Sequence, residues 1–380
     1  MINPKIFFDE LNTLGVDFYA GVPDSLLKYF CAYVTDNVSS ESHVIAANEG
    51  AAVGLGIGYH LSTGGVPLVY LQNSGLGNTI NPIASLADED VYSVPMLLMI
   101  GWRGEPGVKD EPQHIKQGRI TLETLEVMGI PYVVIDENEA ESIGKLKEIT
   151  SISKQASKPC AIVVKKGAFS KYSLKGNTPN NASYKREDVI QAIAEKISEK
   201  ELVVSTTGMA SRELFEYRAC NNQGHAADFL TVGGMGHASQ IALGVAKGAK
   251  DRNVICIDGD GAALMHMGSL AISGMSGVKN FKHIVINNGA HDSVGGQPTL
   301  AFDVDLTAVA KACGYQCFSQ CKSLEQLNDV IQDFLQADGP VFLEVFSDKG
   351  SRPDLGRPTT TPKENKQAYM GNIGLVFNGL

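Results

Sequence analysis

The chain has 380 residues, of which 43% are hydrophobic and 19% are charged, and its formal net charge at pH 7 is -10. This composition excludes a disordered or fibrous protein and is typical of a globular α/β enzyme, while the length exceeds what one hydrophobic core usually supports. The negative charge argues against nucleic acid as a partner, because phosphate backbones are bound through clustered Lys and Arg.

The N-terminus has no signal-peptide pattern, and no apolar run in the chain is long enough to span a membrane. We therefore expect a cytoplasmic protein without a membrane partner. Short β-branched runs alternate with helix-like stretches, and they are VPLVYL from Val66, MLLMI ending at Ile100, PYVVI ending at Ile135 and AIVV ending at Val164. This alternation predicts crossover connections and a parallel sheet.

A polar segment, residues 171–188, interrupts the alternation, and Leu174 is its one strongly apolar aliphatic residue. The alternation restarts after it, with apolar runs at Leu202, Val254, His283 and Val341. The sequence thus predicts an α/β fold of two doubly wound parallel-sheet domains, residues 1–170 and 187–380, joined by a linker at 171–186. No sequence repeat between the two halves is visible.

The seven cysteines are an odd number, and most stand alone within apolar runs, as expected of reduced core residues. Cys313, Cys317 and Cys321 have the spacing C-x3-C-x3-C, which could place them on one face of a helix around a metal. No histidine lies within that run and the spacing fits no standard zinc pattern, so we interpret them as structural.

The strongest motif is Gly259-Asp260-Gly261, followed after 25 intervening residues by Asn287-Asn288. Each half directly follows an apolar run, which places both at the carboxyl ends of parallel strands, where open α/β sheets bind ligands. The Asp260 carboxylate, the Asn288 amide oxygen and the Ala290 carbonyl are hard oxygen donors suited to Mg²⁺. A bare GDG is a common turn, but the pair at this spacing predicts a metal that bridges a diphosphate.

This pair of motifs resembles the cofactor motif of thiamin-diphosphate-dependent enzymes, and the resemblance implies that both domains are of the thiamin-diphosphate-binding type. It also implies that Met235, 25 residues before Asp260, props the cofactor into its bent shape. Outside this context, a Met in a glycine-rich turn is more often core filler. The resemblance extends the cofactor-binding set to neighbouring residues, namely Thr207, Gly208, Met209, Gly234, Gly261, Ala262 and His291.

Two acidic residues of the first half match catalytic positions of the same family. Glu49, in AANEGAAVGLGIGYH, matches the glutamate that hydrogen-bonds N1′ of the aminopyrimidine, although a Glu at a helix N-terminus also stabilises the helix dipole. Asp24, in AGVPDSLL, resembles an aspartate of proton transfer and is equally suited to cap the following helix. Family members bind the cofactor between domains, commonly of different subunits, so we expect a homo-oligomer with sites at the subunit interface.

The segments GDGAALMHMGSLA and INNGAHDSVGGQPT narrow the resemblance to phosphonopyruvate decarboxylases and the related sulfopyruvate decarboxylases, and it covers almost the whole chain. It implies a carboxy-lyase that acts on a small anionic 2-oxo acid. The expected reaction converts 3-phosphonopyruvate to phosphonoacetaldehyde and CO₂, as in phosphonate biosynthesis. The alternatives are sulfopyruvate, which would give sulfoacetaldehyde, or another small 2-oxo acid.

A cation-rich segment follows the run that ends at Ile100. Residues 102–119 (WRGEPGVKDEPQHIKQGR) read as a glycine- and proline-rich loop with several basic side chains. Arg binds phosphonate oxygens with a planar fork and Lys with a point charge, although a solvated loop whose charges contact nothing is the alternative. We predict a proton carrier in His114 and substrate contacts from Ser25, Arg103, Lys109, Arg119 and Gln297.

Three other functions are less consistent with the sequence. A nicotinamide-dependent dehydrogenase needs G-x-G-x-x-G directly after a strand, whereas GLGIGY from Gly54 follows the helix-like segment of Glu49. Carboligating thiamin enzymes such as acetolactate synthases are longer and carry a central domain. A module that binds the cofactor without turnover would not need Glu49, which serves activation.

Overall fold

The structure, a computed structural model, describes residues 1–175 and 183–375. Within these residues the chain forms two compact units, one of residues 1–175 with 293–297 and one of residues 183–292 and 298–375. Residues 176–182 of the predicted linker lie outside the described residues, and its last residue, Arg186, is the first residue of helix α7. The predicted domain boundaries remain predictions.

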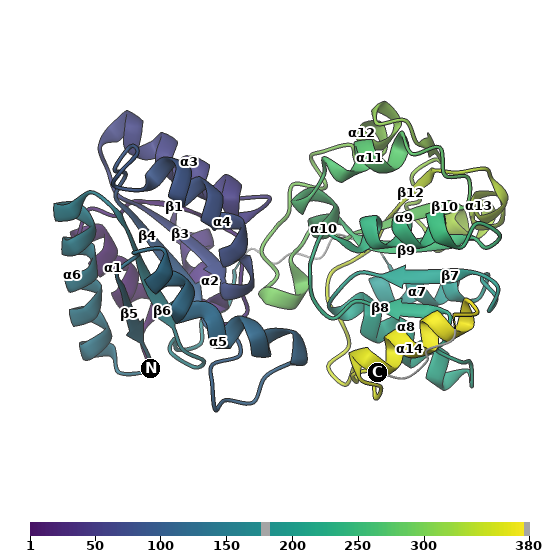
Figure 1. Ribbon diagram of the computed structural model, residues 1–380, viewed down its shortest axis with the longest axis horizontal. Helices are drawn as coiled ribbons and strands as arrows, with labels where there is room; N and C mark the ends of the chain where they lie inside the picture. Colours follow the sequence, from purple (N-terminus) through teal and green to yellow (C-terminus); the bar gives the residue numbers. More distant parts are fainter. Residues whose placement is uncertain (176–182, 376–380) are drawn as a thin grey trace. The chain divides into compact units, whose positions relative to one another are not determined.

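The first unit is a six-stranded sheet with helices on both faces (Figure 1). The strand order is β2-β1-β3-β4-β6-β5, and every neighbouring pair is parallel. The strands are β1 (Phe18–Gly21), β2 (His43–Ile45), β3 (Pro67–Gln72), β4 (Met96–Gly101), β5 (Tyr132–Ile135) and β6 (Pro159–Val164). The helices are α1 (Pro4–Thr13), α2 (Lys28–Asn37), α3 (Glu49–Thr63), η1 (Asn73–Gly75), α4 (Leu76–Pro82), η2 (Ile83–Ala87), α5 (Pro112–Val127) and α6 (Glu139–Ala156).

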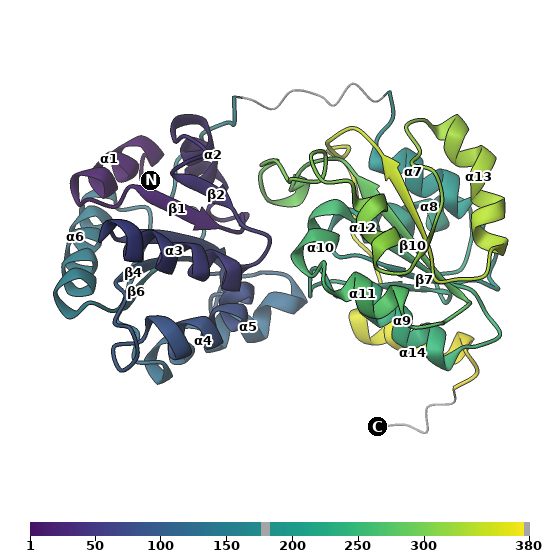
Figure 2. The same ribbon diagram turned by 90° about the horizontal axis from the view of Figure 1, so that it is seen from above.

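Side chains that alternate along these strands build a hydrophobic core on each face of the sheet. Leu97 and Met99 of β4 pack on the side of α1, α2 and α6, whereas Leu98 and Ile100 pack on the side of α3, α4 and α5. Figure 2 shows α1 and α2 on the opposite side of the sheet from α3 and α4. Because both faces are covered, the strands appear in the sequence as continuous apolar runs.

The second unit has a six-stranded parallel sheet with the order β11-β12-β10-β9-β7-β8. Helices α7, α8 and α13 cover one face, and α9, α11, α12 and α14 cover the other. The strands are β7 (Leu202–Ser205), β8 (Asp228–Leu230), β9 (Val254–Gly259), β10 (Phe281–Asn287), β11 (Gln316–Cys317) and β12 (Val341–Phe346). The helices are α7 (Arg186–Ala194), α8 (Met209–Cys220), α9 (Ala238–Gly248), α10 (Asp260–Met265), α11 (Ser269–Gly274), η3 (Asp292–Val294), α12 (Leu306–Ala312), α13 (Leu324–Gln336) and α14 (Pro362–Asn372).

The two sheets have the same topology. If six is subtracted from each strand number of the second sheet and the order is read from β8, the result is 2-1-3-4-6-5, which is the order of the first sheet. The prediction of two doubly wound parallel sheets is therefore confirmed, and the structure adds a duplication that the sequence does not reveal. In this topology the strand order reverses beside the first strand of each sheet, at β1/β3 and β7/β9, where such sheets bind ligands.

One local prediction was wrong. The segment 102–119 is not a loop throughout, because helix α5 begins at Pro112 and carries His114, Lys116 and Arg119. Proline is favoured at the first position of a helix, where its missing N–H has no intrahelical partner to lose. Only residues 102–111 connect β4 to this helix.

The cysteines are free thiols, and the three with C-x3-C-x3-C spacing do not share a helix. Cys313 caps the C-terminus of α12, Cys317 belongs to β11, and Cys321 lies beyond that strand. Among the described residues, the one compact grouping of side chains that could hold a metal is Cys256, Asp258 and His283, so it includes none of these three.

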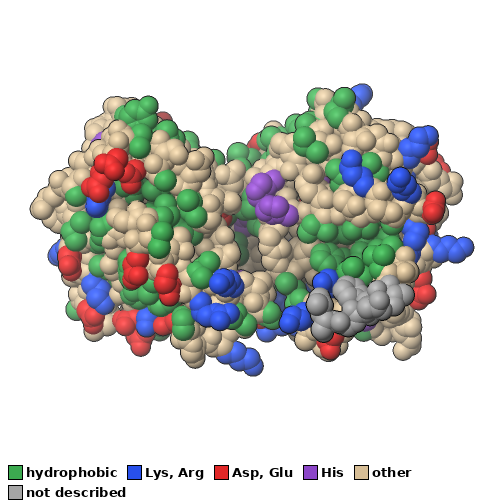
Figure 3. Space-filling model, in the orientation of Figure 1, with side chains coloured by type: hydrophobic (Ala, Val, Ile, Leu, Met, Phe, Trp, Pro, Cys, Tyr) green, Lys and Arg blue, Asp and Glu red, His purple; other side chains and the backbone are tan. Residues whose placement is uncertain are grey.

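None of the described helices combines the length and apolar character that a membrane crossing requires. On the face of the first unit seen in Figure 3, acidic and basic side chains are interspersed among apolar ones.

Two glycines of the first unit test how tightly the sheet is built. A Cβ on Gly21, at the end of β1, would overlap the carbonyl oxygen of Tyr70 on β3, so Gly21→Ala should lower the free energy of unfolding by about 1–3 kcal/mol. Gly144 lies exposed on α6 with open space around it, and Gly144→Ala should raise stability by roughly 0.5–1 kcal/mol. Urea unfolding of both variants measures the difference. If the two substitutions changed the free energy of unfolding equally, the proposed close contact between β1 and β3 at Gly21 would be contradicted.

Candidate functional site

The carboxyl ends of β9 and β10 bring the two halves of the predicted motif together. The strands are neighbours, with Ile286 beside Gly259. Asp260 directly follows β9 as the first residue of α10, and Asn288 directly follows β10. Since parallel strands end at the same edge of a sheet, both side chains lie at that edge.

Asp260 is a buried carboxylate, with 3% of its surface exposed. Its Oδ2 accepts a hydrogen bond from Thr299 Oγ1 at 2.5 Å, and no Lys or Arg among the described residues forms an ion pair with it. Burial raises the pKa of Asp260 to about 6, because the charged form loses hydration. A divalent cation would supply the positive charge that the protein itself does not provide here.

The two asparagines are used differently. Asn287 Nδ2 donates to Glu344 Oε1 of β12 at 2.7 Å and to the carbonyl of Ala301 at 2.9 Å, so this side chain serves the core. Asn288 Nδ2 donates to Asp292 Oδ2 at 2.8 Å, and its Oδ1 accepts from Ala290 N at 3.1 Å. Asn288 and Ala290 are both buried. The second asparagine is therefore the one presented at the sheet edge, as the motif predicts.

Gly261 is the point on which two other predicted residues converge. A Cβ at this position would lie 3.1 Å from His291 Cε1 and 3.3 Å from Met235 Cε. Both distances are tighter than ordinary contact, so a larger residue would displace one of these side chains. Burial lowers the pKa of His291 to about 4, and its imidazole is therefore neutral near pH 7.

The loops after β7 and β8 carry further predicted cofactor contacts of this unit. Gly208 has a φ of 96°, a conformation that favours glycine, and α8 begins at Met209 directly after it. Thr207 precedes this turn and is half-buried. Gly234, with a φ of 66°, turns the chain just before Met235. Such glycine turns ahead of a helix expose backbone N–H groups, and these suit a diphosphate.

In the first unit, Glu49 is buried at the N-terminus of α3, with 5% of its surface exposed. Asn48 caps the helix by accepting a hydrogen bond from Ala51 N, so Glu49 itself is not needed as the cap. Its Oε2 accepts from Asn78 Nδ2 at 2.7 Å, and Gly75 leaves room for Oε1, which a Cβ there would overlap. The carboxylate is thus fixed by two segments that follow β3.

Asp24 lies in the turn after β1 and is fully buried. Its Oδ2 accepts from Leu26 N at 2.9 Å and Leu27 N at 3.3 Å, whereas its Oδ1 has no hydrogen-bond partner among the described residues. Gly101 at the end of β4 makes space for this carboxyl, since a Cβ there would overlap Oδ2. Burial raises the pKa of Asp24 to about 6, although the nearby Arg103 partly opposes that rise.

The guanidinium group of Arg103 forms hydrogen bonds with Asp110 of its own loop and with Ser25 of the turn after β1. Its Nε and Nη2 donate to Asp110 at 2.8 and 2.6 Å, and its Nη1 donates to Ser25 Oγ at 2.7 Å. The same Asp110 lies 3.0 Å from His114 Nδ1, and these bonds hold the pKa of Asp110 well below its ordinary value. Burial lowers the pKa of His114. These three bonds to Asp110 and Ser25 use three of the five guanidinium N–H donors of Arg103 and leave two.

The other predicted substrate residues differ in exposure. The side chains of Lys109 and Arg119 are exposed and form no hydrogen bond or ion pair with any described residue. Gln297 is fully buried, yet neither its amide nitrogen nor its amide oxygen has a hydrogen-bond partner within the described chain. The described residues therefore leave the hydrogen-bonding capacity of this amide unused.

Several residues around these groups escaped the sequence analysis. Asp110 and Asn73 order the Arg103 loop, Thr299 holds Asp260, and Asp292 holds Asn288. Asp110, Asp292 and Thr299 lie within the segments 102–119 and 286–299, but the sequence analysis did not single them out. Asn73 and Thr299 act on residues 30 and 39 positions away, which sequence spacing does not reveal. Asp110 and Asp292 lie seven and four residues from Arg103 and Asn288, so local spacing could have suggested both.

Comparisons with known proteins show the family of the chain. The family described as thiamine pyrophosphate enzyme, N-terminal TPP binding domain, matches residues 4–125, and the corresponding C-terminal TPP binding domain matches residues 206–345. The chain is 36% identical to the phosphonopyruvate decarboxylase of Streptomyces viridochromogenes, over 98% of this chain and 95% of the relative. It is 33% identical to that of Streptomyces hygroscopicus, over 96% and 92% respectively. It is 27% identical to the sulfopyruvate decarboxylase of Methanosarcina acetivorans, over 97% of each chain.

The buried carboxyl of Asp24 predicts a pH-dependent stability. Its pKa is about 6 in the folded chain and near 3.8 when unfolded, so the folded chain binds more protons between these values and loses stability as pH rises across them. Asp24→Asn should therefore stabilise the cofactor-free protein near pH 7.5 by about 3 kcal/mol, because the two pKa values differ by about 2.2 and a difference of one corresponds to ~1.4 kcal/mol. Near pH 4 the gain should vanish.

Thermal unfolding midpoints of the variant and the wild type at both pH values measure this effect. Asp90→Asn is the matched control, because Asp90 is an exposed carboxylate of the same unit and its substitution should change little at either pH. A gain from Asp24→Asn that is the same at both pH values would show that charge burial is not its cause.

Proposed function

The chain belongs to the thiamine pyrophosphate enzymes, in the family of the phosphonopyruvate decarboxylases, and on this premise we propose that it decarboxylates 3-phosphonopyruvate to phosphonoacetaldehyde and CO₂. The product places the reaction in phosphonate biosynthesis. The enzyme is a carboxy-lyase that depends on thiamin diphosphate.

One observation carries the proposed chemistry. Asp260 and Asn288 stand side by side at the ends of neighbouring strands, and the Asp260 carboxylate is buried without a cation. With the carbonyl of Ala290, they form a set of hard oxygen donors that fits Mg²⁺ better than a softer metal. The metal would be shared with the diphosphate, whose remaining oxygens would meet backbone N–H groups near Gly208 and Gly261.

Thiamin diphosphate, when bound, supplies the nucleophilic carbon that adds to the 2-oxo group and takes up the electrons released with CO₂. Met235 and His291, which meet over Gly261, would shape the cavity for its rings. The neighbouring residues Thr207, Met209, Gly234 and Ala262 complete the proposed cofactor contacts. Glu49, in the other unit, would hold a proton at N1′ of the aminopyrimidine and so promote the proton transfer that activates the cofactor.

Asp24 and His114 would transfer protons to and from the substrate. The Oδ1 of Asp24 has no partner within the described chain, and with a pKa of about 6 this carboxyl can carry a proton near neutral pH. It would deliver that proton to the carbon that loses the carboxylate. His114, kept uncharged by burial and oriented by Asp110, would relay protons to this carboxyl.

The distal phosphonate would be recognised by the cations around residues 103–119. Arg103 has two N–H donors beyond those that bond to Asp110 and Ser25. The same bonds hold the plane of its guanidinium group in a fixed orientation. Lys109 and Arg119 would add charge from the exposed side of this segment. Gln297 would contribute its unpaired amide.

Sulfopyruvate is the second candidate substrate, because a sulfopyruvate decarboxylase is similar to the chain over 97% of its length. A sulfonate differs from a phosphonate in charge and would need the same donors. The choice between them rests on the higher identity to the two phosphonopyruvate decarboxylases, 36% and 33% against 27%.

We further propose a cytoplasmic homo-oligomer with active sites at the subunit interface. The assignment follows from family resemblance, since the residues for the pyrimidine and those for the diphosphate belong to different units of the chain. Interfaces of this kind are usually related by twofold symmetry.

A panel of 2-oxo acids tests the proposed function. The purified chain with thiamin diphosphate and Mg²⁺ should release CO₂ and an aldehyde from phosphonopyruvate, with a kcat/KM that exceeds those for sulfopyruvate and pyruvate. A charge-assisted contact is worth ~1.5–3 kcal/mol, so the preference over pyruvate should be roughly 10- to 150-fold or more.

Glu49→Gln keeps the size of the side chain and should lower this turnover by ~10²-fold or more, since one acid/base contribution is lost. Lys147→Gln, on exposed helix α6, is the control that should leave turnover unchanged. A preference for sulfopyruvate would reassign the substrate, and absence of turnover with every acid would refute the decarboxylase itself.

A further inference from the structure

A second carboxylate, Asp292, lies next to the proposed metal ligands without belonging to them. Its Oδ2 accepts three hydrogen bonds, from Asn288 Nδ2 at 2.8 Å, Arg186 Nη1 at 3.1 Å and Gly350 N at 2.9 Å. These donors come from the ends of β10 and β12 and from the start of α7. Asp292 thus joins three segments at the edge of the sheet where the motif lies.

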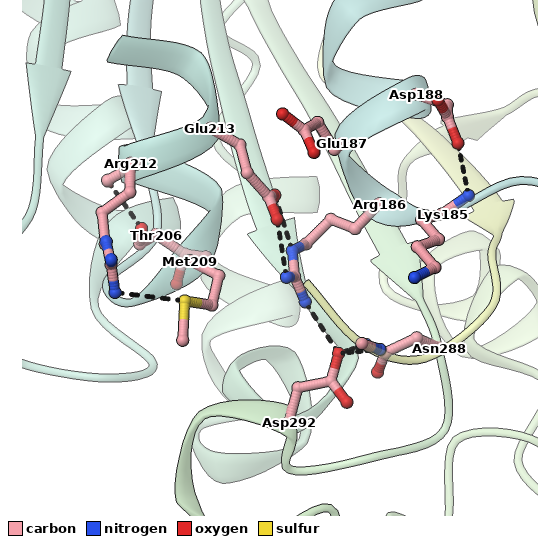
Figure 4. Close-up of polar contacts among 12 residues, drawn as sticks. Lys185, Arg186, Glu187, Asp188, Thr206, Met209, Arg212, Glu213, Asn288 and Asp292 are labelled. Carbon is pink, nitrogen blue, oxygen red and sulfur yellow. Dashed lines mark hydrogen bonds and ion pairs between the residues drawn. The ribbon is translucent and has the colours of Figure 1, made fainter. Parts of the chain in front are cut away.

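Arg186 connects Asp292 to the core of the unit. Its Nε and Nη2 donate to the two oxygens of Glu213 on α8, both at 2.8 Å, while its Nη1 reaches Asp292. Arg186 is 8% exposed and Glu213 is 1% exposed. Figure 4 shows Arg186 between the two carboxylates, with Asp292 in turn facing Asn288. A buried fork held at both ends in this way has little freedom to move.

The hydrogen bond from Asn288 to the fixed Asp292 carboxylate determines the orientation of the Asn288 amide. An amide can turn over and exchange its nitrogen for its oxygen with almost no change in shape. A carboxylate only accepts hydrogen bonds, so Asp292 can face the nitrogen but not the oxygen of Asn288. If the Asn288 amide were turned over, its oxygen would face the Asp292 carboxylate, and both are hydrogen-bond acceptors. Its NH₂ group, a donor, would then point towards the metal.

We propose that Asp292 and Arg186 are positioning residues for the metal site, which fix the Asn288 amide with its oxygen available to the cation. This inference rests on the proposed function, because it takes Asp260, Asn288 and Ala290 as the metal ligands. The Oδ2 atom of Asp292 is already used by Arg186, Gly350 and Asn288, so we assign Asp292 to positioning and not to the metal ligands. Groups that orient metal ligands in this manner typically change metal affinity by roughly 10- to 100-fold when removed.

Mn²⁺ is the probe for the test, because the electron paramagnetic resonance signal of the free ion decreases as the ion binds. In saturating thiamin diphosphate, Asp292→Asn should weaken Mn²⁺ binding by roughly 10- to 100-fold, since the new amide can face either atom of Asn288. Arg186→Lys retains the charge but loses the fork, and it should weaken binding in the same direction. High Mg²⁺ should restore the turnover of both variants.

The control is Arg218→Lys. Arg218 and Asp228 form a buried bidentate pair in the same unit, with 5% and 0% of their side chains exposed, and neither contacts the motif. Arg218→Lys should lower the thermal unfolding midpoint about as much as Arg186→Lys but leave Mn²⁺ affinity unchanged. This comparison separates positioning from general stability.

Unchanged Mn²⁺ affinity in both Asp292→Asn and Arg186→Lys would overturn the proposal, and so would an equal loss in Arg218→Lys. If the wild type binds no Mn²⁺, the metal assignment fails and the positioning role fails with it. If the variants bind Mn²⁺ weakly as expected while the wild type decarboxylates none of the acids, the positioning role is supported and the proposed reaction alone is refuted.

Discussion

The carboxylate of Asp260, held out of water at the end of β9 without a positive partner among the described residues, is the constraint around which the second unit is arranged. Burying such a charge is unfavourable unless a cation accompanies it. Thr299 gives it one hydrogen bond, and the surrounding oxygens of Asn288 and Ala290 add acceptors and no charge compensation. The described residues therefore leave this charge uncompensated, and in the proposed function a divalent cation would balance it.

The same sheet topology occurs twice in the chain, yet the two copies carry different chemistry at their carboxyl ends. In the first unit these ends carry Asp24 and Arg103, with Glu49 at the start of the helix that follows β2, and in the proposed function they would supply proton carriers and a cation. In the second unit they carry Asp260 and Asn288, which would supply oxygen ligands. The same scaffold with different loop residues can therefore serve different chemical roles.

The sequence predicted the parts that depend on short segments. Strands buried on both faces appear as apolar runs, and Asp260 and Asn288 follow such runs directly, so the fold class and the motif could be read locally. The helix that starts at Pro112 was missed, although a proline at its first position was a local signal. The Arg186–Asp292 contact joins residues 106 positions apart, and the pairing of Arg103 with Asp110 depends on a loop conformation that spacing alone does not specify.

Calorimetric titration of thiamin diphosphate tests the central claim most directly, because it measures cofactor binding independently of any substrate. The account predicts that the wild-type chain binds the cofactor when Mg²⁺ is present and not when the metal is removed by a chelator. It also predicts that Asp260→Ala abolishes this metal-dependent binding. Equally tight binding with and without Mg²⁺, or metal-dependent binding that persists in Asp260→Ala, would contradict the assignment of the site.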